Sequence, residues 1–246
     1  MKKLLLLGGL RYLIPVIKEA KELGYYTITC DYLPENIAHQ YSDEYYDVSI
    51  TDKTAVLELA KKLKIDGIMS FAVDPGVVTA AYVAEKLGLP GCPLKSVEIL
   101  QNKGLFRAFL KEHNFNVPQA KAFSTYSAAV EEISKFQFPL IAKPVDSAGS
   151  KGVSRIESLN ELESAIDLAV LNSDSNTFII EEYIEARGYA SDSDGFSLNG
   201  KLEVVTFSNQ YFNARSENPY TPSAYSWPSS ISIANQGHLK EELQRL

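Results

Sequence analysis

The first 95 residues alternate short apolar runs with stretches of helical periodicity. Residues 4–7 form an apolar run of strand length, Gly8-Gly9 predicts a turn, and apolar residues then recur at helical spacing up to Gly24. The alternation continues with predicted strands over residues 25–30 and 67–71 and predicted helices over residues 54–63 and 76–87. Strands that are apolar on both faces favour a parallel sheet covered by helices on both sides. We therefore predict a doubly wound parallel-sheet α/β domain over residues 1–95.

The pattern changes after the prolines that follow this domain. A helical stretch over residues 96–114 is predicted to link it to a compact α+β module over residues 115–184. The last segment, residues 185–246, opens with a predicted β-hairpin, because its Asn199-Gly200 pair readily supplies the positive φ angles of a tight turn. The remainder is rich in Asn, Pro, Ser and Tyr and ends in a charged stretch, residues 239–246, that is predicted to be helical.

Composition and charge narrow the class of protein. Lys and Arg total 24 against 31 Asp and Glu, so the net charge of −7 provides no field that would attract nucleic acid or an anionic membrane. Cys30 and Cys92 have no metal-site spacing and form no disulfide framework, which favours a reducing cytoplasm. No apolar run approaches the ~20 residues that cross a bilayer, and Arg11 interrupts the apolar start too early for a signal peptide.

A loop of small residues follows a strand that ends in a lysine. The run from Lys143 to Val153 reads Lys-Pro-Val-Asp-Ser-Ala-Gly-Ser-Lys-Gly-Val. Backbone N–H groups of such a loop can approach phosphate oxygens while the lysine supplies positive charge, so the run indicates a phosphate site. A flexible hairpin loop without function is an equally good interpretation of the composition. The spacing is not that of the Walker loop, which excludes a P-loop nucleotidase.

A second candidate is the apolar strand over residues 178–184, which ends in Glu181-Glu182-Tyr183-Ile184. Adenine needs an apolar slot with a backbone donor and acceptor at its polar edge, and a carboxylate can accept the proton of its amino group. A strand that leaves a core can offer all of these. Taken alone, the segment fits a plain core strand with solvated ends better.

Taken in order, these segments resemble the N-terminal part of an ATP-grasp ligase, in the branch similar to the large chain of carbamoyl-phosphate synthase. The resemblance covers nearly all 246 residues. It rests on Lys103 within Asn-Lys-Gly-Leu-Phe-Arg at 102–107, Val117-Pro118, Phe-Pro-Leu-Ile-Ala-Lys-Pro at 138–144, the loop 147–153 and Glu-Glu-Tyr-Ile at 181–184. Agreement across several separated segments is more specific than one glycine loop.

The resemblance implies a fold and an ATP site. Residues 1–95 would be the domain that precedes an ATP-grasp domain, residues 115–184 the lid subdomain, and residues 185–246 the first part of an incomplete large subdomain. Lys103 and the catalytic Lys143 would approach the ATP phosphates from opposite sides. A lid made by the loop with Ser147, Gly149, Ser150 and Gly152 would cover the phosphates, and Glu181 with the backbone of Glu182, Tyr183 and Ile184 would hold adenine.

The resemblance also implies a substrate crevice and a reaction. Gly8, Gly9 and Asp74 lie where predicted parallel strands end, which is where open sheets bind ligands; a tight turn and a helix cap before Pro75 explain them equally well. Arg215 could bind a substrate carboxylate, although a solvated loop charge is the better interpretation. ATP would phosphorylate a small carboxylate to an acylphosphate, and an amine would displace the phosphate. This chemistry needs no protein nucleophile, and His39, His113 and His238 are expected at the surface.

Two departures from the family pattern affect the expected activity. Gly188 stands where the family usually has a glutamate that holds the ribose, so either Asp192 or Glu185 compensates or the ribose is held loosely. The family's Glu-x-Asn pair of magnesium ligands is expected beyond Leu246, so no metal ligand is predicted in this chain. We therefore expect an N-terminal fragment, whether from cloning or a split gene, that is inactive alone. Its unprotected apolar face favours self-association or a C-terminal partner fragment.

Two alternatives from other classes stay open. A nucleotide or sugar-nucleotide binding module without ligase chemistry would lack the metal ligands by nature. A dinucleotide oxidoreductase is suggested by Gly8-Gly9 before a helix and Asp31 about 22 positions later, but the later glycine of Gly-x-Gly-x-x-Gly is missing.

Overall fold

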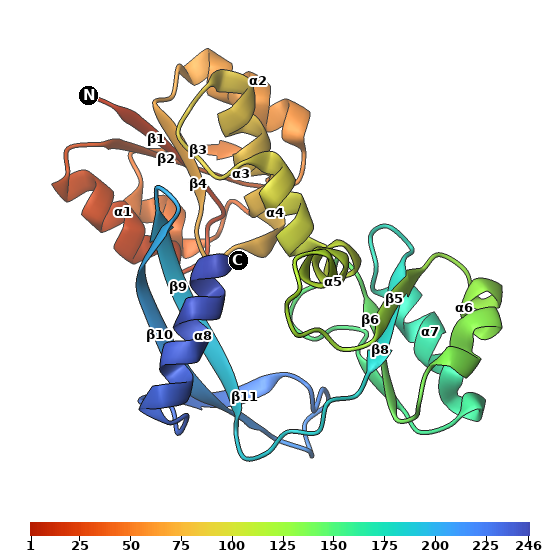
Figure 1. Cartoon of the computed structure of the whole chain (residues 1–246). Coiled ribbons are helices and arrows are strands. Elements are labelled where there is room, and N and C mark those ends of the chain that lie inside the picture. The colour runs from red at the N-terminus through yellow and green to blue at the C-terminus, as the bar shows by residue number, and fades with distance from the viewer. The chain divides into compact units, whose positions relative to one another are not determined.

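The computed structural model describes all 246 residues and divides the chain into two compact units, residues 1–115 and 116–246 (Figure 1). The helical stretch expected as a linker falls within the first unit, as α4 (Leu94–Gln101) and α5 (Lys103–Glu112). No helix combines the length and the apolar character that are needed to span a bilayer.

The first unit is built on a four-stranded parallel sheet with the strand order β3-β2-β1-β4. The strands are β1 (Lys3–Leu7), β2 (Tyr26–Asp31), β3 (Glu44–Asp47) and β4 (Gly67–Ser70). The helices are α1 (Leu13–Glu22), α2 (Lys53–Leu63) and α3 (Asp74–Leu87), with a short 3-10 helix η1 (Ile37–Tyr41). Leu5 and Leu7 face a core shared with α2 and α3, whereas Leu6 faces α1 and η1. The sheet is therefore covered on both faces, which confirms the doubly wound α/β prediction.

The second unit begins with an antiparallel sheet in the order β5-β8-β6-β7. Its strands are β5 (Ala120–Phe123), β6 (Leu140–Pro144), β7 (Ser154–Ile156) and β8 (Phe178–Glu182). Its helices are α6 (Tyr126–Glu132), η2 (Ile133–Lys135), η3 (Leu159–Glu161) and α7 (Leu162–Leu171). Leu140, Ala142, Phe178 and Ile180 alternate along β6 and β8 and pack into the core with α7. The mixture of strands and helices predicted for residues 115–184 is present, and these residues share one compact unit with residues 185–246.

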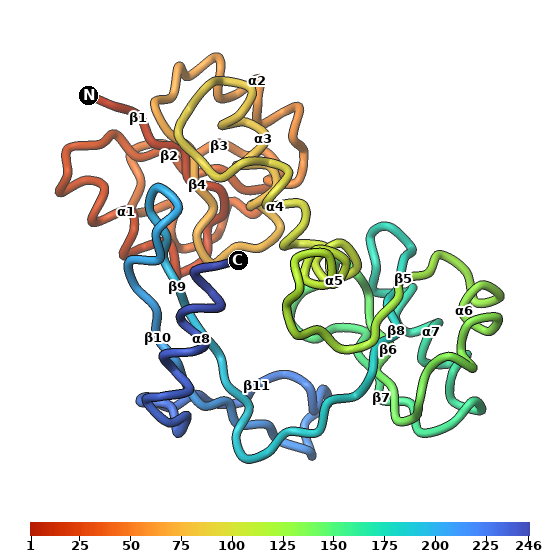
Figure 2. Tube along the Cα trace, in the orientation of Figure 1, coloured from red at the N-terminus to blue at the C-terminus, as the bar shows by residue number.

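The C-terminal part of the second unit is a three-stranded antiparallel sheet with one helix (Figures 1 and 2). The predicted hairpin is present as β9 (Ala190–Leu198) and β10 (Lys201–Phe212), and both turn residues have positive φ, 52° at Asn199 and 77° at Gly200. Sequence reasoning missed β11 (Pro222–Ser226), which pairs with β10. Helix α8 (Ile233–Arg245) packs against β10 and begins earlier than expected.

One face of this hairpin is apolar and exposed. Phe196 on β9 pairs with Val204 on β10, Leu198 lies two residues further along β9, and more than half of each side chain is accessible. The exposed apolar face expected from the sequence is therefore present, and self-association through it stays a prediction.

Candidate functional site

Two residues predicted to bind ATP, Lys143 and Glu181, are in direct contact. In the antiparallel pair of β6 and β8, Lys143 lies opposite Ile179 and Ile141 lies opposite Glu181. Because side chains alternate along a strand, Lys143 and Glu181 are diagonal neighbours on the face that points away from the α7 core. Their side chains form an ion pair, and only 16% and 8% of them are exposed. A positive group is thus held at a nearly buried position.

The glycine loop, defined as residues 147–152, is anchored at its start by Asp146. The carboxylate of Asp146 accepts hydrogen bonds from Ser173 Oγ at 2.8 Å and from the backbone N of Ser175 at 2.9 Å. Burial acts to raise the pKa of Asp146, but these hydrogen bonds outweigh it and hold the pKa below its usual value. The loop therefore starts from a fixed, charged anchor.

The end of the glycine loop is fixed by close packing. A Cβ atom at Gly152 would lie 2.9 Å from Asn172 Cβ and 2.9 Å from Pro144 Cγ, and the φ angle there is +70°. Gly149 and Ser150 also have positive φ, but a Cβ atom at Gly149 would meet nothing within 4 Å. The loop is thus packed tightly at Gly152 and open at Gly149.

The end of strand β8 presents one backbone donor without a protein acceptor. The N–H of Glu182 donates to Gln119 O at 2.9 Å, and the N–H of Tyr183 donates to Pro139 O at 3.3 Å. The N–H of Ile184 donates to no protein group, and 67% of its side chain is exposed. Beside it, the guanidinium of Arg155 lies 4.2 Å from the centre of the Tyr183 ring. Among the three residues predicted to hold adenine, Ile184 is the one with an available N–H.

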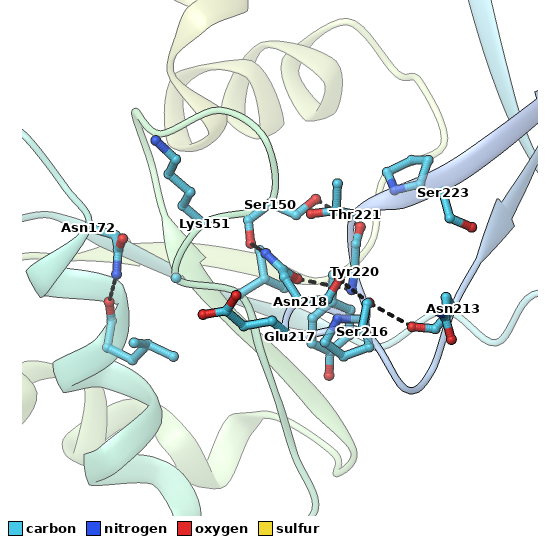
Figure 3. A pocket seen from close by; sticks show the side chains of 15 residues that line it. Ser150, Lys151, Asn172, Asn213, Ser216, Glu217, Asn218, Tyr220, Thr221 and Ser223 are labelled. Carbon is cyan, nitrogen blue, oxygen red and sulfur yellow. Dashed lines mark hydrogen bonds between the residues drawn. The ribbon is translucent and has the colours of Figure 1, made fainter.

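A pocket of about 690 Å³ lies between the glycine loop, α7 and residues 213–223 (Figure 3). Ser150 and Gly152 are the two predicted ATP-binding residues that line it, together with Lys151, Asn172, Glu217 and Asn218 among others. Lys143 and Glu181 do not line it. Arg215 is exposed and also outside the lining, so its assignment to a substrate carboxylate stays a prediction.

The predicted substrate residues of the first unit are brought to one edge of its sheet. Gly8 and Gly9 follow β1, Asp74 follows the neighbouring strand β4, and a Cβ atom at Gly8 would lie 2.8 Å from Val73 Cγ2. Asp74 is the exposed first residue of α3, whose N-cap is Val73, so the helix-cap interpretation of Asp74 was wrong.

His39 is not the surface residue that we expected. A Cβ atom at Gly9 would lie 2.5 Å from the His39 ring, whose Nδ1 is 2.9 Å from Thr29 Oγ1 and whose Nε2 is 3.1 Å from Leu33 O. Burial lowers the pKa of His39, although Leu33 O and Asp31 act to raise it. The ring is therefore a half-buried structural group, whereas His113 and His238 are exposed as expected.

Lys103 is the first residue of α5, and Asn102 caps this helix by accepting a hydrogen bond from the N–H of Leu105 at 3.0 Å. It belongs to the first unit, whereas Lys143 belongs to the second. Convergence of the two ammonium groups on one triphosphate stays a prediction.

No group of three His, Cys, Asp or Glu side chains in the chain is placed to hold a metal ion. Because Mg2+ is usually held by one or two carboxylates together with substrate phosphates, this finding assigns no residue of the chain to magnesium, and no step is derived through it.

Comparisons with known proteins identify relatives along most of the chain. Residues 105–211 match the family model for the D-ala D-ala ligase C-terminus. Formate-dependent phosphoribosylglycinamide formyltransferase of Prochlorococcus marinus is 31% identical over 190 residues, which are 74% of this chain and 47% of that protein. The carbamoyl phosphate synthase large chain of Clostridium beijerinckii is 24% identical over 188 residues, which are 74% of this chain and 18% of that protein. The chain thus spans about half of the first relative and about a fifth of the second.

Solved structures agree on the fold. The L-amino acid ligase of Bacillus licheniformis superimposes with a TM-score of 0.78 at 21% identity, over 99% of this chain and 59% of that one. N5-carboxyaminoimidazole synthetase of Staphylococcus aureus, solved with ADP, gives 0.79 at 15% identity, over 99% of this chain and 62% of that one. These structures thus share the fold of this chain, and the family-model match and the sequence relatives identify the chain as a relative of the ATP-grasp ligases, among them the large chain of carbamoyl phosphate synthase.

Proposed function

We propose that this chain binds ATP and serves an ATP-dependent ligation of a small carboxylate to an amine through an acylphosphate. The observation that carries the proposal is the ion pair of Lys143 and Glu181, because it holds a cation and an anion, nearly buried, on one sheet face beside the end of β8. Similarity to ATP-grasp ligases supports the same reaction class.

In this proposal, the phosphates and the adenine ring of ATP each have a chemical counterpart in the chain. The ammonium of Lys143 binds a phosphate oxygen, and the backbone N–H groups of the glycine loop bind other phosphate oxygens. The N–H of Ile184 and the carboxylate of Glu181 bind the polar edge of adenine. Lys103 supplies a second positive charge from the first unit. Charge on the transferred phosphoryl group is then stabilised by positioned cations rather than by a nucleophile of the protein.

The carboxylate substrate is proposed to bind at the sheet edge of the first unit, where Gly8, Gly9 and Asp74 follow adjacent strands. Arg215 is the proposed partner of its carboxylate. A cytoplasmic location, where ATP is abundant and the free thiols of Cys30 and Cys92 persist, is part of the same proposal.

A second candidate function is nucleotide binding without ligation. It is favoured by Gly188, which has no side chain for a ribose contact. ADP formation from ATP and magnesium, measured over a panel of carboxylates and amines, separates the two candidates. The ligase predicts that ADP forms when a suitable carboxylate and amine are present, whereas a nucleotide-binding module predicts ATP binding without ADP formation.

Calorimetric titration with ATP and magnesium tests nucleotide binding itself. Lys143→Gln removes a charge-assisted hydrogen bond and should weaken ATP binding by about tenfold to a hundredfold. Lys151→Gln, which changes a more exposed lysine of the glycine loop, serves as the matched control with a smaller loss. Equal affinities of the wild type and Lys143→Gln would contradict the assignment of Lys143.

A further inference from the structure

The glycine loop is bound by a short segment about 70 residues later in the chain, residues 218–221. Asn218 Nδ2 donates to Ser150 O at 3.0 Å, and Thr221 Oγ1 donates to Gly149 O at 3.2 Å. In return, Ser150 Oγ donates to Tyr220 O at 2.9 Å. Figure 3 shows Asn218, Tyr220 and Thr221 gathered around Ser150. Every one of these contacts engages an oxygen atom of the loop.

The orientation of the loop amides follows from these contacts. The peptide bonds on either side of Ser150 are trans, and in a trans peptide the C=O and N–H point in opposite directions. Because the Gly149 carbonyl points to Thr221, the N–H of Ser150 points away from it. Because the Ser150 carbonyl points to Asn218, the N–H of Lys151 points away as well. The 218–221 segment therefore turns two consecutive N–H groups toward the opposite side of the loop.

The 218–221 segment is itself held in place. Asn218 Oδ1 accepts a hydrogen bond from the N–H of Tyr220 at 3.0 Å, which fixes the side-chain amide that reaches Ser150. Ser216 Oγ lies 2.9 Å from Asn218 O and donates to it. The hydroxyl of Tyr220 accepts a hydrogen bond from the N–H of Arg155, in the middle of β7, at 3.2 Å. The segment is thus hydrogen-bonded both to the glycine loop and to strand β7.

We propose that the 218–221 segment is a latch that positions the amides of Ser150 and Lys151 for the ATP phosphates, with Asn218 and Thr221 as positioning residues. This inference rests on the proposed ATP-binding function. Gly149 lies in open space, so without the segment the loop would sample many conformations. Donors that are already oriented toward the phosphate oxygens bind them more tightly, because the loop then loses less conformational entropy on binding. The latch selects the conformation in which oxygen atoms face the segment and N–H groups face away.

The test uses the whole chain and the double variant Asn218→Ala/Thr221→Val, which removes both donors. The matched control is Ser223→Ala, which removes a hydroxyl that donates to Tyr211 O at 3.0 Å and does not touch the loop. Thr221→Ser on its own keeps the hydroxyl and should behave as the wild type. Two quantities are measured: the dissociation constants of ATP and AMP, and the rate of tryptic cleavage after Lys151 without nucleotide.

The latch predicts that the double variant binds ATP about tenfold more weakly while its affinity for AMP is unchanged, because AMP lacks the outer phosphates. Cleavage after Lys151 should become several-fold faster, while cleavage after Lys201 in the hairpin turn stays at the wild-type rate. The latch alone would be overturned if the wild type binds ATP but the double variant keeps the wild-type rate of cleavage after Lys151 and the wild-type ratio of the dissociation constants of ATP and AMP. Failure of the wild type to bind ATP would overturn the proposed function instead.

Discussion

Lys143 and Glu181 form an ion pair between adjacent strands although 38 residues separate them in the sequence, and Glu181 is the more deeply buried partner. Charges that are removed from water are tolerated in a fold only when they are compensated. Glu181→Gln takes away the carboxylate that compensates Lys143. We expect it to lower the free energy of unfolding by about 2 kcal/mol in urea denaturation.

The neighbouring variant Glu182→Gln controls for the loss of one negative charge from the same strand. Because Glu182 is exposed, the free energy of unfolding of this variant should differ from that of the wild type by less than about 0.5 kcal/mol. Equal losses in the two variants would show that the ion pair contributes nothing beyond net charge.

The two glycines of the loop should differ in their tolerance of a methyl group. At Gly152 an added Cβ would overlap Asn172 and Pro144, so Gly152→Ala should cost about 3 kcal/mol of unfolding free energy. At Gly149 the space is open and only the positive φ is unfavourable, so Gly149→Ala should cost about 1 kcal/mol. Thermal and urea unfolding of both variants measures the difference. The opposite ranking would mean that the loop is not packed against α7 as described.

The stability of the first unit should depend on pH through His39. Burial lowers the folded-state pKa of His39 below the ordinary value of 6.5, so the unfolded chain binds a proton more readily. Stability should therefore fall as the pH drops below about 6.5. His39→Gln should show a smaller loss between pH 7.5 and pH 5.5 in urea denaturation. If the free energy of unfolding of the wild type and of His39→Gln falls equally with pH, this role of His39 is excluded.

The two cysteines should differ sharply in reactivity. Burial raises the pKa of the Cys30 thiol to about 12, with the charges of Asp31 and Asp47 acting in the same direction, whereas Cys92 is exposed. Because the thiolate is the reactive form, iodoacetamide at neutral pH should modify Cys92 and spare Cys30. Mass spectrometry of the native protein should find one adduct per chain, and denaturant should add the second. Rapid native labelling of Cys30 would mean that β2 is not buried as described.

Much of the fold could be predicted because its signals are local. The apolar run at residues 4–7 and the Asn199-Gly200 hairpin each depend on neighbouring residues, and both are present, whereas the turn predicted at Gly8-Gly9 lies a little later, where the N–H of Leu13 donates to Leu10 O. Strand β11 was missed because its residues resemble an irregular loop, and its pairing with β10 is decided by tertiary contacts.

The candidate site was predicted only as a set of separate segments. The sequence indicated Lys143 and Glu181 individually, but their contact depends on the register of β6 and β8, which the pattern does not specify. The bonds of Asn218 and Thr221 to the glycine loop left no local signal, because the two segments lie about 70 residues apart. His39 was missed for the same reason, since its close approach to Gly9 appears only in the folded unit.

The most direct test of the ATP-site assignment is to map where adenine lies. The protein is irradiated with 8-azido-ATP, digested, and the modified residues are identified by mass spectrometry with and without excess ATP. We predict an adduct within residues 178–184 that excess ATP suppresses. ATP-protected adducts confined to residues 1–115, for example around Gly8-Gly9 and Asp31, would contradict the account.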